Sequence, residues 1–427
     1  MAALALVLVV ALVPRLLVVA LGAAPPVRSD ASGYDAAARR LLATGTYAFP
    51  VGRALWSQDV VRADAWSSYL AMPSNAWAMP GYSVFLAAIY RLAGTGPGRF
   101  TAVHILQAVL GAAAVMLLFR IADELFGRRA AWATVILNAL YPPSLSLAGF
   151  LLTETLFTFL LAGQIAVMVW AAGSQRWLAY ALLGALTAAA VYVRPVAAFV
   201  PLVLLALELH RGLTDARSRP ALGRQALRFV ACAGVAAALL APWWLRNAAL
   251  YGVFMPTNSA AALPAIQGEL MAHGLAVPDE TYAQFALPAL TGNDDHVYAE
   301  KVARQILRVS PLAARHEFAA GQIGRARMLG PALLSPFTFD SRAYPWASRQ
   351  VAMQAAILCL AVFGWWRHRR RLEASWLIMG VALYILLVHW QVGFLTPRYL
   401  YPMMPLLLML AGAGVTAMSP GPAKAAT

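Results

Sequence analysis

The 427-residue sequence has little charge and almost no cysteine. Charged residues make up only 12% of the chain and hydrophobic residues 61%, with a mean hydropathy of +0.66. A soluble domain of this length does not need so much apolar surface, so the composition predicts an integral membrane protein. The two cysteines, Cys232 and Cys359, lie within apolar runs, and we therefore expect neither a disulfide framework nor a cysteine metal site.

Motifs for nucleotide and zinc chemistry are also missing. The chain has no Gly-rich P-loop, no G-x-G-x-x-G opening a helix after a strand and no H-E-x-x-H, and its seven histidines are scattered. The acidic pair Asp294-Asp295 beside His296 follows Thr291-Gly292-Asn293, which favours a solvated turn over a metal site. These absences disfavour nucleotide-driven transport and zinc hydrolysis, and we expect no metal site.

Long apolar runs fill the chain instead. Crossing about 30 Å of hydrocarbon takes about 20 helical residues, and strands of alternating polarity are missing, so the pattern favours a helical bundle over a barrel. The predicted spans are residues 1–21, 100–120, 130–148, 150–172, 177–193, 195–210, 228–246, 351–367, 374–391 and 397–417. The predicted fold class is an all-α polytopic membrane protein with about ten transmembrane helices.

A shorter apolar segment at 80–93 is interpreted as a helix lying on or re-entering the membrane surface. This choice places the dense arginine clusters, such as Arg367 to Arg371, on one side, which the positive-inside bias makes the cytoplasm. Both termini are then cytoplasmic. The long loop 22–99 and the segment 247–350 face outwards.

Three regions follow from this topology. Residues 1–255 form a transmembrane module with a first outer loop at 22–99, and residues 351–427 form the C-terminal helices and a short cytoplasmic tail. Between them, residues 256–350 are predicted to form a small outer cap, with amphipathic helices at 297–309 and 311–329. The two halves show no internal repeat.

Two carboxylates at the outer ends of spans are candidate catalytic groups. Asp30 follows the first span and is either a catalytic base or, with Asp35, a charge that caps a helix start. Glu154 opens an apolar helix, where a carboxylate at membrane depth costs about 2.5 to 3.5 kcal/mol on insertion scales, so it needs a partner. The alternative is a first-turn glutamate beside a Thr153 cap.

Three arginines occupy outer span ends by the same topology: Arg194, Arg246 and Arg398. Three converging guanidinium groups would bind a phosphate or diphosphate, as a lipid-phosphate leaving group requires. Each one alone is better explained as a snorkelling anchor at a headgroup boundary, whereas the three together favour a phosphate site.

Several motifs, in their order along the chain, resemble the polyprenyl-phosphate-dependent GT-C glycosyltransferases. The motifs are Asp30, Gly33-Tyr34-Asp35, Pro80-Gly81-Tyr82, Leu125-Phe126-Gly127-Arg128-Arg129, Tyr141-Pro142-Pro143, Thr153-Glu154-Thr155, Arg194-Pro195, Pro242-Trp243-Trp244-Leu245-Arg246-Asn247 and Arg398-Tyr399. They are most similar to the bacterial branch related to protein O-mannosyltransferases and to the aminoarabinose transferase that acts on lipid A. The resemblance covers residues 1 to about 255 and resumes near 398.

The resemblance implies a GT-C-like bundle in a bacterial inner membrane with a periplasmic active site. It implies a sugar donor on polyprenyl phosphate, a lipid, glycan or protein acceptor, and membrane lipids but no nucleic acid as partners. Asp30 and Glu154 take the catalytic positions. The implied substrate-binding residues are Tyr34, Asp35, Tyr82, Arg194, Trp244, Arg246 and Arg398.

The expected mechanism is inverting transfer without a cofactor. Asp30 would accept the acceptor's proton while Arg246, helped by Arg194 or Arg398, stabilises the departing phosphate. We expect metal independence, with a divalent cation bound by Asp30 and Glu154 as the alternative.

Two other classes of function stay open from the sequence. One is a lipid-linked sugar flippase or transporter. The other is an inactive GT-C-fold partner subunit, since Ala31 follows Asp30 where the family often has an adjacent Asp-Glu pair.

Overall fold

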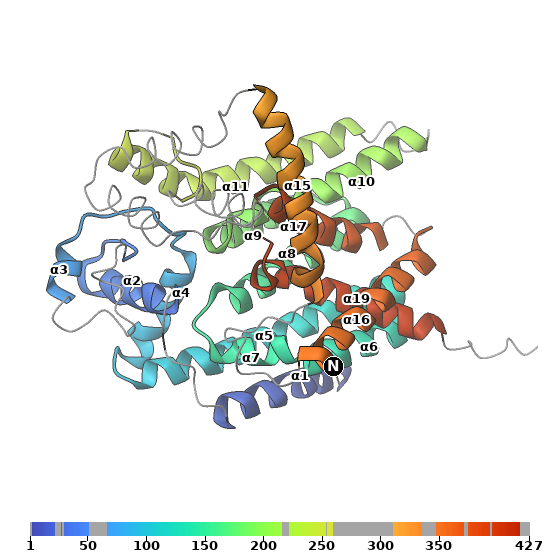
Figure 1. Ribbon diagram of the computed structural model, residues 1–427, viewed down its shortest axis with the longest axis horizontal. Helices are drawn as coiled ribbons and strands as arrows, with labels where there is room; N and C mark the ends of the chain where they lie inside the picture. Colours follow the sequence, from blue (N-terminus) through green and yellow to red (C-terminus); the bar gives the residue numbers. More distant parts are fainter. Residues whose placement is uncertain are drawn as a thin grey trace, which may run out of the picture.

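The computed structural model describes residues 2–21, 27, 30–50, 66–215, 222–252, 254–258, 311–334, 347–370, 375–392 and 395–418. Every regular element in these ranges is a helix (Figure 1). The predicted all-α fold class is therefore confirmed.

Six helical segments in the described ranges are long and apolar enough to cross a membrane. They are α1 (Ala2–Leu21), α5 (Gly98–Phe126), α8 (Thr153–Ser174), η3 with α10 (Pro195–Phe199 and Pro201–Thr214), α11 (Leu222–Tyr251), and the run of α18, η7 and α19 (Pro397–Leu400, Tyr401–Met403 and Met404–Met418). Three shorter apolar helices accompany them: α4 (Gly81–Ala93), α9 (Trp177–Val193) and α17 (Leu377–Val392). A multi-pass membrane protein is confirmed, while the count of about ten spans stays a prediction.

The span predicted at 130–148 is wrong as one continuous helix. The segment divides into α6 (Arg128–Leu140), α7 (Pro142–Ser146) and the short η2 (Leu147–Gly149). Tyr141 ends α6 with extended backbone at φ −67° and ψ 113°. A residue before proline is pushed out of the helical region, so Pro142 explains the break.

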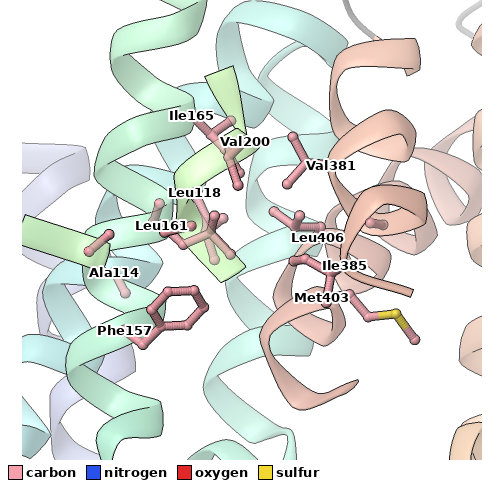
Figure 2. Packing of buried hydrophobic residues seen from close by; sticks show 14 of the residues in the cluster. Ala114, Leu118, Phe157, Leu161, Ile165, Val200, Val381, Ile385, Met403 and Leu406 are labelled. Carbon is pink, nitrogen blue, oxygen red and sulfur yellow. The ribbon is translucent and has the colours of Figure 1, made fainter. Parts of the chain in front are cut away.

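The bundle is built around α5, which packs against α1, α6 and α8. On one side α19 packs against α6 and α16 (Ala347–His368), and on the other α9 packs between α8 and α11. Figure 2 shows Leu118 of α5, Phe157 and Leu161 of α8 and Leu406 of the last helix gathered in one apolar core, where each is at most 1% exposed.

Helices of the first outer loop gather at one end of the bundle (Figure 1). They are α2 (Asp30–Thr44), α3 (Trp66–Ala71) and α4. Arg40 of α2 donates hydrogen bonds of 2.7 Å to the carbonyl oxygens of Tyr69 and Met72, which ties α2 to α3. The helix predicted at 80–93 is confirmed as α4, and it packs on α2 through a separate apolar cluster that includes Tyr82 and Leu86.

One helix of the predicted outer cap is described. The amphipathic helix predicted at 311–329 is α15 (Pro311–Leu334), which starts at Pro311 and runs five residues further than predicted. Trp390 of α17 donates its indole N–H to Gln322 Oε1 at 2.7 Å, which holds α15 against the bundle. The helix predicted at 297–309 and the C-terminal tail lie outside the described residues.

Candidate functional site

Four charged side chains form one continuous chain at the boundary between the bundle and the first outer loop. Arg398 donates from Nη1 to Asp30 Oδ2 at 2.7 Å and from Nε to Glu154 Oε1 at 2.6 Å. Arg194 donates from Nη2 to the same Glu154 oxygen at 2.8 Å. The structure therefore brings together both predicted catalytic carboxylates and two of the three predicted arginines.

Prolines help to position both arginines. Arg194 ends α9 with φ −147° and ψ 121° before Pro195, and Thr396 is extended at φ −118° and ψ 152° before Pro397 and Arg398. Since a residue before proline avoids the helical region, each proline produces a break in the chain at a helix junction. The arginines at these breaks meet Glu154 in the first turn of α8 and Asp30 at the start of α2.

The two carboxylates differ in exposure. The Glu154 side chain is 0% exposed and accepts hydrogen bonds from both arginines, whereas the Asp30 side chain is 37% exposed. A buried carboxylate is stable only when it is paired, and the two guanidinium groups supply that pairing. Asp30 is therefore the carboxylate of the pair that solvent or a ligand can reach.

Arg194 has one guanidinium nitrogen still available. Its Nε donates to Thr153 Oγ1 at 3.0 Å and its Nη2 pairs with Glu154, but its buried Nη1 has no hydrogen-bond partner among the described residues. Its guanidinium also lies 5.4 Å from the Tyr399 ring centroid. A buried donor without a partner is unfavourable by about 1 to 3 kcal/mol, so this nitrogen is suited to an incoming anionic oxygen.

Tyr34 lies one turn after Asp30 on α2. Its ring contacts Phe49 and Tyr82 edge-on, with centroids 5.4 and 5.1 Å away. Burial and the nearby Asp30 carboxylate raise the pKa of Tyr34 well above its usual value. Its phenol is therefore protonated at neutral pH and can donate a hydrogen bond.

Tyr82 connects the outer loop to the segment that precedes Glu154. Its hydroxyl donates to Gln107 Oε1 at 2.8 Å, and Gln107 Nε2 donates to the carbonyl oxygens of Ala148 at 3.2 Å and Phe150 at 2.8 Å. Gln107 was not among the predicted residues, although a glutamine inside an apolar helix is a readable signal. It joins α4, α5 and the segment at residues 148–150, just before α8.

Asp35 lies in a different cluster from Asp30. Its carboxylate accepts hydrogen bonds from Arg99 at 2.8 and 3.2 Å and from the Tyr90 hydroxyl at 2.9 Å, and it is 1% exposed. This geometry gives Asp35 a structural task, joining α2 to α4 and α5. Its predicted role in substrate binding stays a prediction.

Arg246 and Trp244 of α11 donate hydrogen bonds to backbone carbonyl oxygens, and Arg246 Nη1 also donates to the side-chain oxygen Asn247 Oδ1 at 3.1 Å. Arg246 Nη2 donates to the carbonyl oxygens of Tyr47 at 2.9 Å and Asn75 at 3.0 Å, and Trp244 Nε1 donates to Pro256 O at 2.9 Å. These bonds tie the first outer loop and the segment after α11 to the bundle. The predicted convergence of Arg246 with Arg194 and Arg398 on one phosphate therefore stays a prediction.

The described residues contain no group of three or more histidine, cysteine or acidic side chains that could hold a metal ion. Asp30 and Glu154 are instead joined by the Arg398 guanidinium. A guanidinium at this position supplies the positive charge that a bridging cation would otherwise supply.

Comparisons with known proteins identify the fold that carries these residues. Residues 77–245 match the family model described as dolichyl-phosphate-mannose-protein mannosyltransferase. A structure of the oligosaccharyltransferase AglB from Archaeoglobus fulgidus, in complex with an inhibitory peptide and a dolichol-phosphate, overlays with a TM-score of 0.58 at 13% identity. The overlay covers 97% of this chain and 50% of that one. This chain has the GT-C fold.

Further GT-C structures resemble this chain. The same archaeal enzyme tethered to an acceptor peptide gives a TM-score of 0.59 at 14% identity over 97% of this chain and 49% of that one. ArnT from Cupriavidus metallidurans bound to undecaprenyl phosphate gives a TM-score of 0.42 at 16% identity, over 97% and 77% of the two chains. No curated protein matches the sequence. This chain spans about half the length of the archaeal oligosaccharyltransferase whose fold it shares.

Proposed function

We propose that this GT-C protein transfers a sugar from a polyprenyl-phosphate donor to an acceptor hydroxyl at the periplasmic face of a bacterial inner membrane. The observation that carries the proposal is the chain of Asp30, Arg398, Glu154 and Arg194. In it, one carboxylate is partly exposed and one guanidinium nitrogen has no partner among the described residues. An acid–base group beside a phosphate-binding group is what transfer from a lipid phosphate requires.

Asp30 is the proposed general base. As the acceptor oxygen attacks the sugar C1, the bond between C1 and the phosphate oxygen breaks and the acceptor's proton passes to the Asp30 carboxylate. The electron pair of the broken bond stays on the departing lipid phosphate. In-line attack from the face opposite the phosphate inverts the anomeric centre.

Arg194 and Arg398 are the proposed phosphate ligands. Arg194 Nη1 is a buried donor without a partner among the described residues, and the Arg398 side chain is 19% exposed. Glu154 then serves as a positioning residue, since it holds both guanidinium groups from a completely buried position. This assigns Glu154 a different task from Asp30, although both belong to one catalytic cluster.

The family and fold support the choice of donor. The matched family is described by a dolichyl-phosphate sugar donor, and the archaeal oligosaccharyltransferase was solved with a dolichol-phosphate. The proposed periplasmic orientation rests on the positive-inside bias, because the sequence concentrates its arginine clusters in loops that the predicted topology places on the side opposite the first outer loop. No described contact identifies the class of acceptor, so the experiment offers a mixture of acceptors from the cell envelope.

The test is sugar transfer by the full-length protein in proteoliposomes that contain a radiolabelled polyprenyl-phosphate sugar and an envelope extract as acceptor source. Label should move from the lipid carrier to an acceptor, and Asp30→Asn should lower the rate by about 10²- to 10⁴-fold. The matched control is Asp123→Asn, whose ion pair with Arg128 is partly exposed, and it should transfer at the wild-type rate.

Two outcomes would reject the proposal. Transfer by Asp30→Asn at the wild-type rate would remove Asp30 from the chemistry. Label that crosses the vesicle membrane while remaining on its carrier would identify a flippase.

A further inference from the structure

A second charged site lies inside the membrane-spanning bundle. Arg15 of α1 is 3% exposed, and its guanidinium donates to Ala11 O at 2.7 Å and Asn138 O at 3.3 Å. No described carboxylate forms an ion pair with it. A charge inside a bilayer is strongly unfavourable unless an opposite charge lies nearby. We therefore expect a negatively charged group next to the Arg15 guanidinium.

The surrounding helices leave room for the guanidinium. A Cβ atom added at Gly111 of α5 would lie 2.7 Å from Arg15 Nε, so the side chain fits only because α5 has a glycine there. The Asn138 carbonyl belongs to the last turn of α6, where the helix dipole presents partial negative charge. This dipole corresponds to about half an elementary charge and leaves the cation only partly balanced.

A small cavity lies beside the guanidinium. Its volume is about 20 Å³, and its polar lining includes Arg15, Asn138, Ser144, Thr158 and Tyr401. The buried Thr158 Oγ1 has no hydrogen-bond partner within the described part of the chain. Ser144 Oγ and Tyr401 Oη are joined by a hydrogen bond of 2.9 Å. The cavity thus combines a guanidinium with the unpartnered Thr158 hydroxyl, and no carboxylate lines it.

We propose that this cavity binds one small monovalent anion, with chloride as the physiological occupant. The volume admits a single water-sized particle, so phosphate, sulfate and carboxylate ligands are too large. A water molecule would satisfy Thr158 but would leave the Arg15 charge uncompensated. A halide accepts hydrogen bonds from the guanidinium and the Thr158 hydroxyl together and neutralises the charge.

The bound anion would stabilise the packing of α1, α8 and η7, and the last two lie close in the chain to residues of the proposed catalytic cluster. Thr158 lies one turn after Glu154 on α8, and Tyr401 lies three residues after Arg398. The site is separate from that cluster, and its occupancy is measurable without any sugar transfer. Failure of the glycosyltransferase proposal would therefore leave this inference intact.

The experiment uses the full-length protein in detergent. Crystals grown in sodium bromide should show an anomalous peak in the cavity between Arg15 and Thr158. Thermal unfolding in sodium chloride against sodium gluconate, at equal ionic strength, should show a saturable rise in the midpoint of about 2–4 °C with chloride.

Variants give the matched comparison. Thr158→Val keeps the side-chain shape and removes the unpartnered hydroxyl, so it should lose most of the chloride response, as should Arg15→Met. Thr134→Val is the control, because that buried hydroxyl donates to Ala130 O at 2.8 Å on the same helix, and it should keep the response.

Bromide crystals with only water in the cavity would overturn the proposal. An unfolding midpoint that is identical in chloride and gluconate, or a full chloride response in Thr158→Val, would overturn it as well.

Discussion

Arg398 and Asp30 form an ion pair of 2.7 Å although 368 positions separate them in the chain. The same guanidinium donates to the buried Glu154 through a second nitrogen at 2.6 Å. One side chain near the C-terminus therefore fixes the distance between the two acidic residues of the candidate site. Its fork of donors is what allows it to serve both carboxylates.

Arg398→Lys should lower sugar transfer by about 10²-fold. Lysine retains the charge, but its single ammonium cannot reproduce the two donors of the rigid guanidinium. Asp30 and Glu154 would then no longer be held at a fixed distance by one side chain. The measurement is kcat/KM with a labelled polyprenyl-phosphate sugar. Arg128→Lys is the control, since the Arg128 side chain is 58% exposed in its pair with Asp123, and it should match the wild type. Wild-type activity in Arg398→Lys would argue against the bridging role.

Asp35→Asn should destabilise the fold by about 3–5 kcal/mol, because it leaves the buried Arg99 guanidinium without its carboxylate. The free energy of unfolding in detergent measures the effect. Asp123→Asn provides the comparison and should change stability by only about 0–1 kcal/mol, as expected for a surface ion pair. Intact stability combined with weakened substrate affinity in Asp35→Asn would instead support the predicted substrate-binding role.

Gln107→Leu should lower kcat by about 10-fold per folded molecule, because Tyr82 and the segment before Glu154 lose their common hydrogen-bond partner. Gln164→Leu is the matched control. It also removes a completely buried amide in a spanning helix, whose Nε2 donates to Thr187 Oγ1 at 3.0 Å. Gln164→Leu should lose less stability, because the buried Gln164 Oε1 has no hydrogen-bond partner among the described residues, and only Gln107→Leu should lose turnover per folded molecule. An equal loss of kcat in both would reduce Gln107 to a general packing role.

Gly364→Ala should destabilise the packing of α16 on α19, because the added Cβ would collide with the backbone carbonyl of Leu410. Gly173→Ala, near the end of α8, meets no atom within 4 Å and should stabilise its helix by about 0.5–1 kcal/mol. Unfolding midpoints of the two variants should move in opposite directions. Movement in the same direction would show that α16 and α19 are not in close contact in solution.

The sequence predicted the fold class and most helix positions, because long apolar runs need no tertiary information to be recognised. It missed the break after Leu140, where Tyr141-Pro142-Pro143 interrupts an apolar run that is otherwise long enough to span. A hydropathy pattern reports the length and apolar composition of a segment. It does not report that a proline keeps the residue before it out of the helical conformation.

Topology placed Asp30, Glu154, Arg194 and Arg398 at one depth, and the structure brings these four into contact. Depth does not specify which face of a helix a side chain occupies. This is why the sequence grouped Arg246 with the other arginines, whereas its guanidinium binds the carbonyl oxygens of Tyr47 and Asn75.

Polar residues inside apolar runs were the signal that went unused. Arg15 and Gln107 both lie within predicted spans, where a polar side chain is a functional or structural site by default. Their partners, Asn138 and the backbone of residues 148–150, come from segments that no sequence pattern connects to them.

Sugar transfer should be independent of divalent cations. The Arg398 guanidinium lies between the Asp30 and Glu154 carboxylates, so a cation bridging them would have to displace a half-buried charge that is hydrogen-bonded to both. Wild-type protein treated with EDTA should keep its full kcat, and added Mg²⁺ or Mn²⁺ should not raise it. The informative variant is Arg398→Ala, which removes the positive charge between the carboxylates and should stay inactive in EDTA but regain part of its activity with Mn²⁺. Loss of wild-type activity in EDTA that added cation restores would mean that the carboxylates separate to bind a metal during turnover.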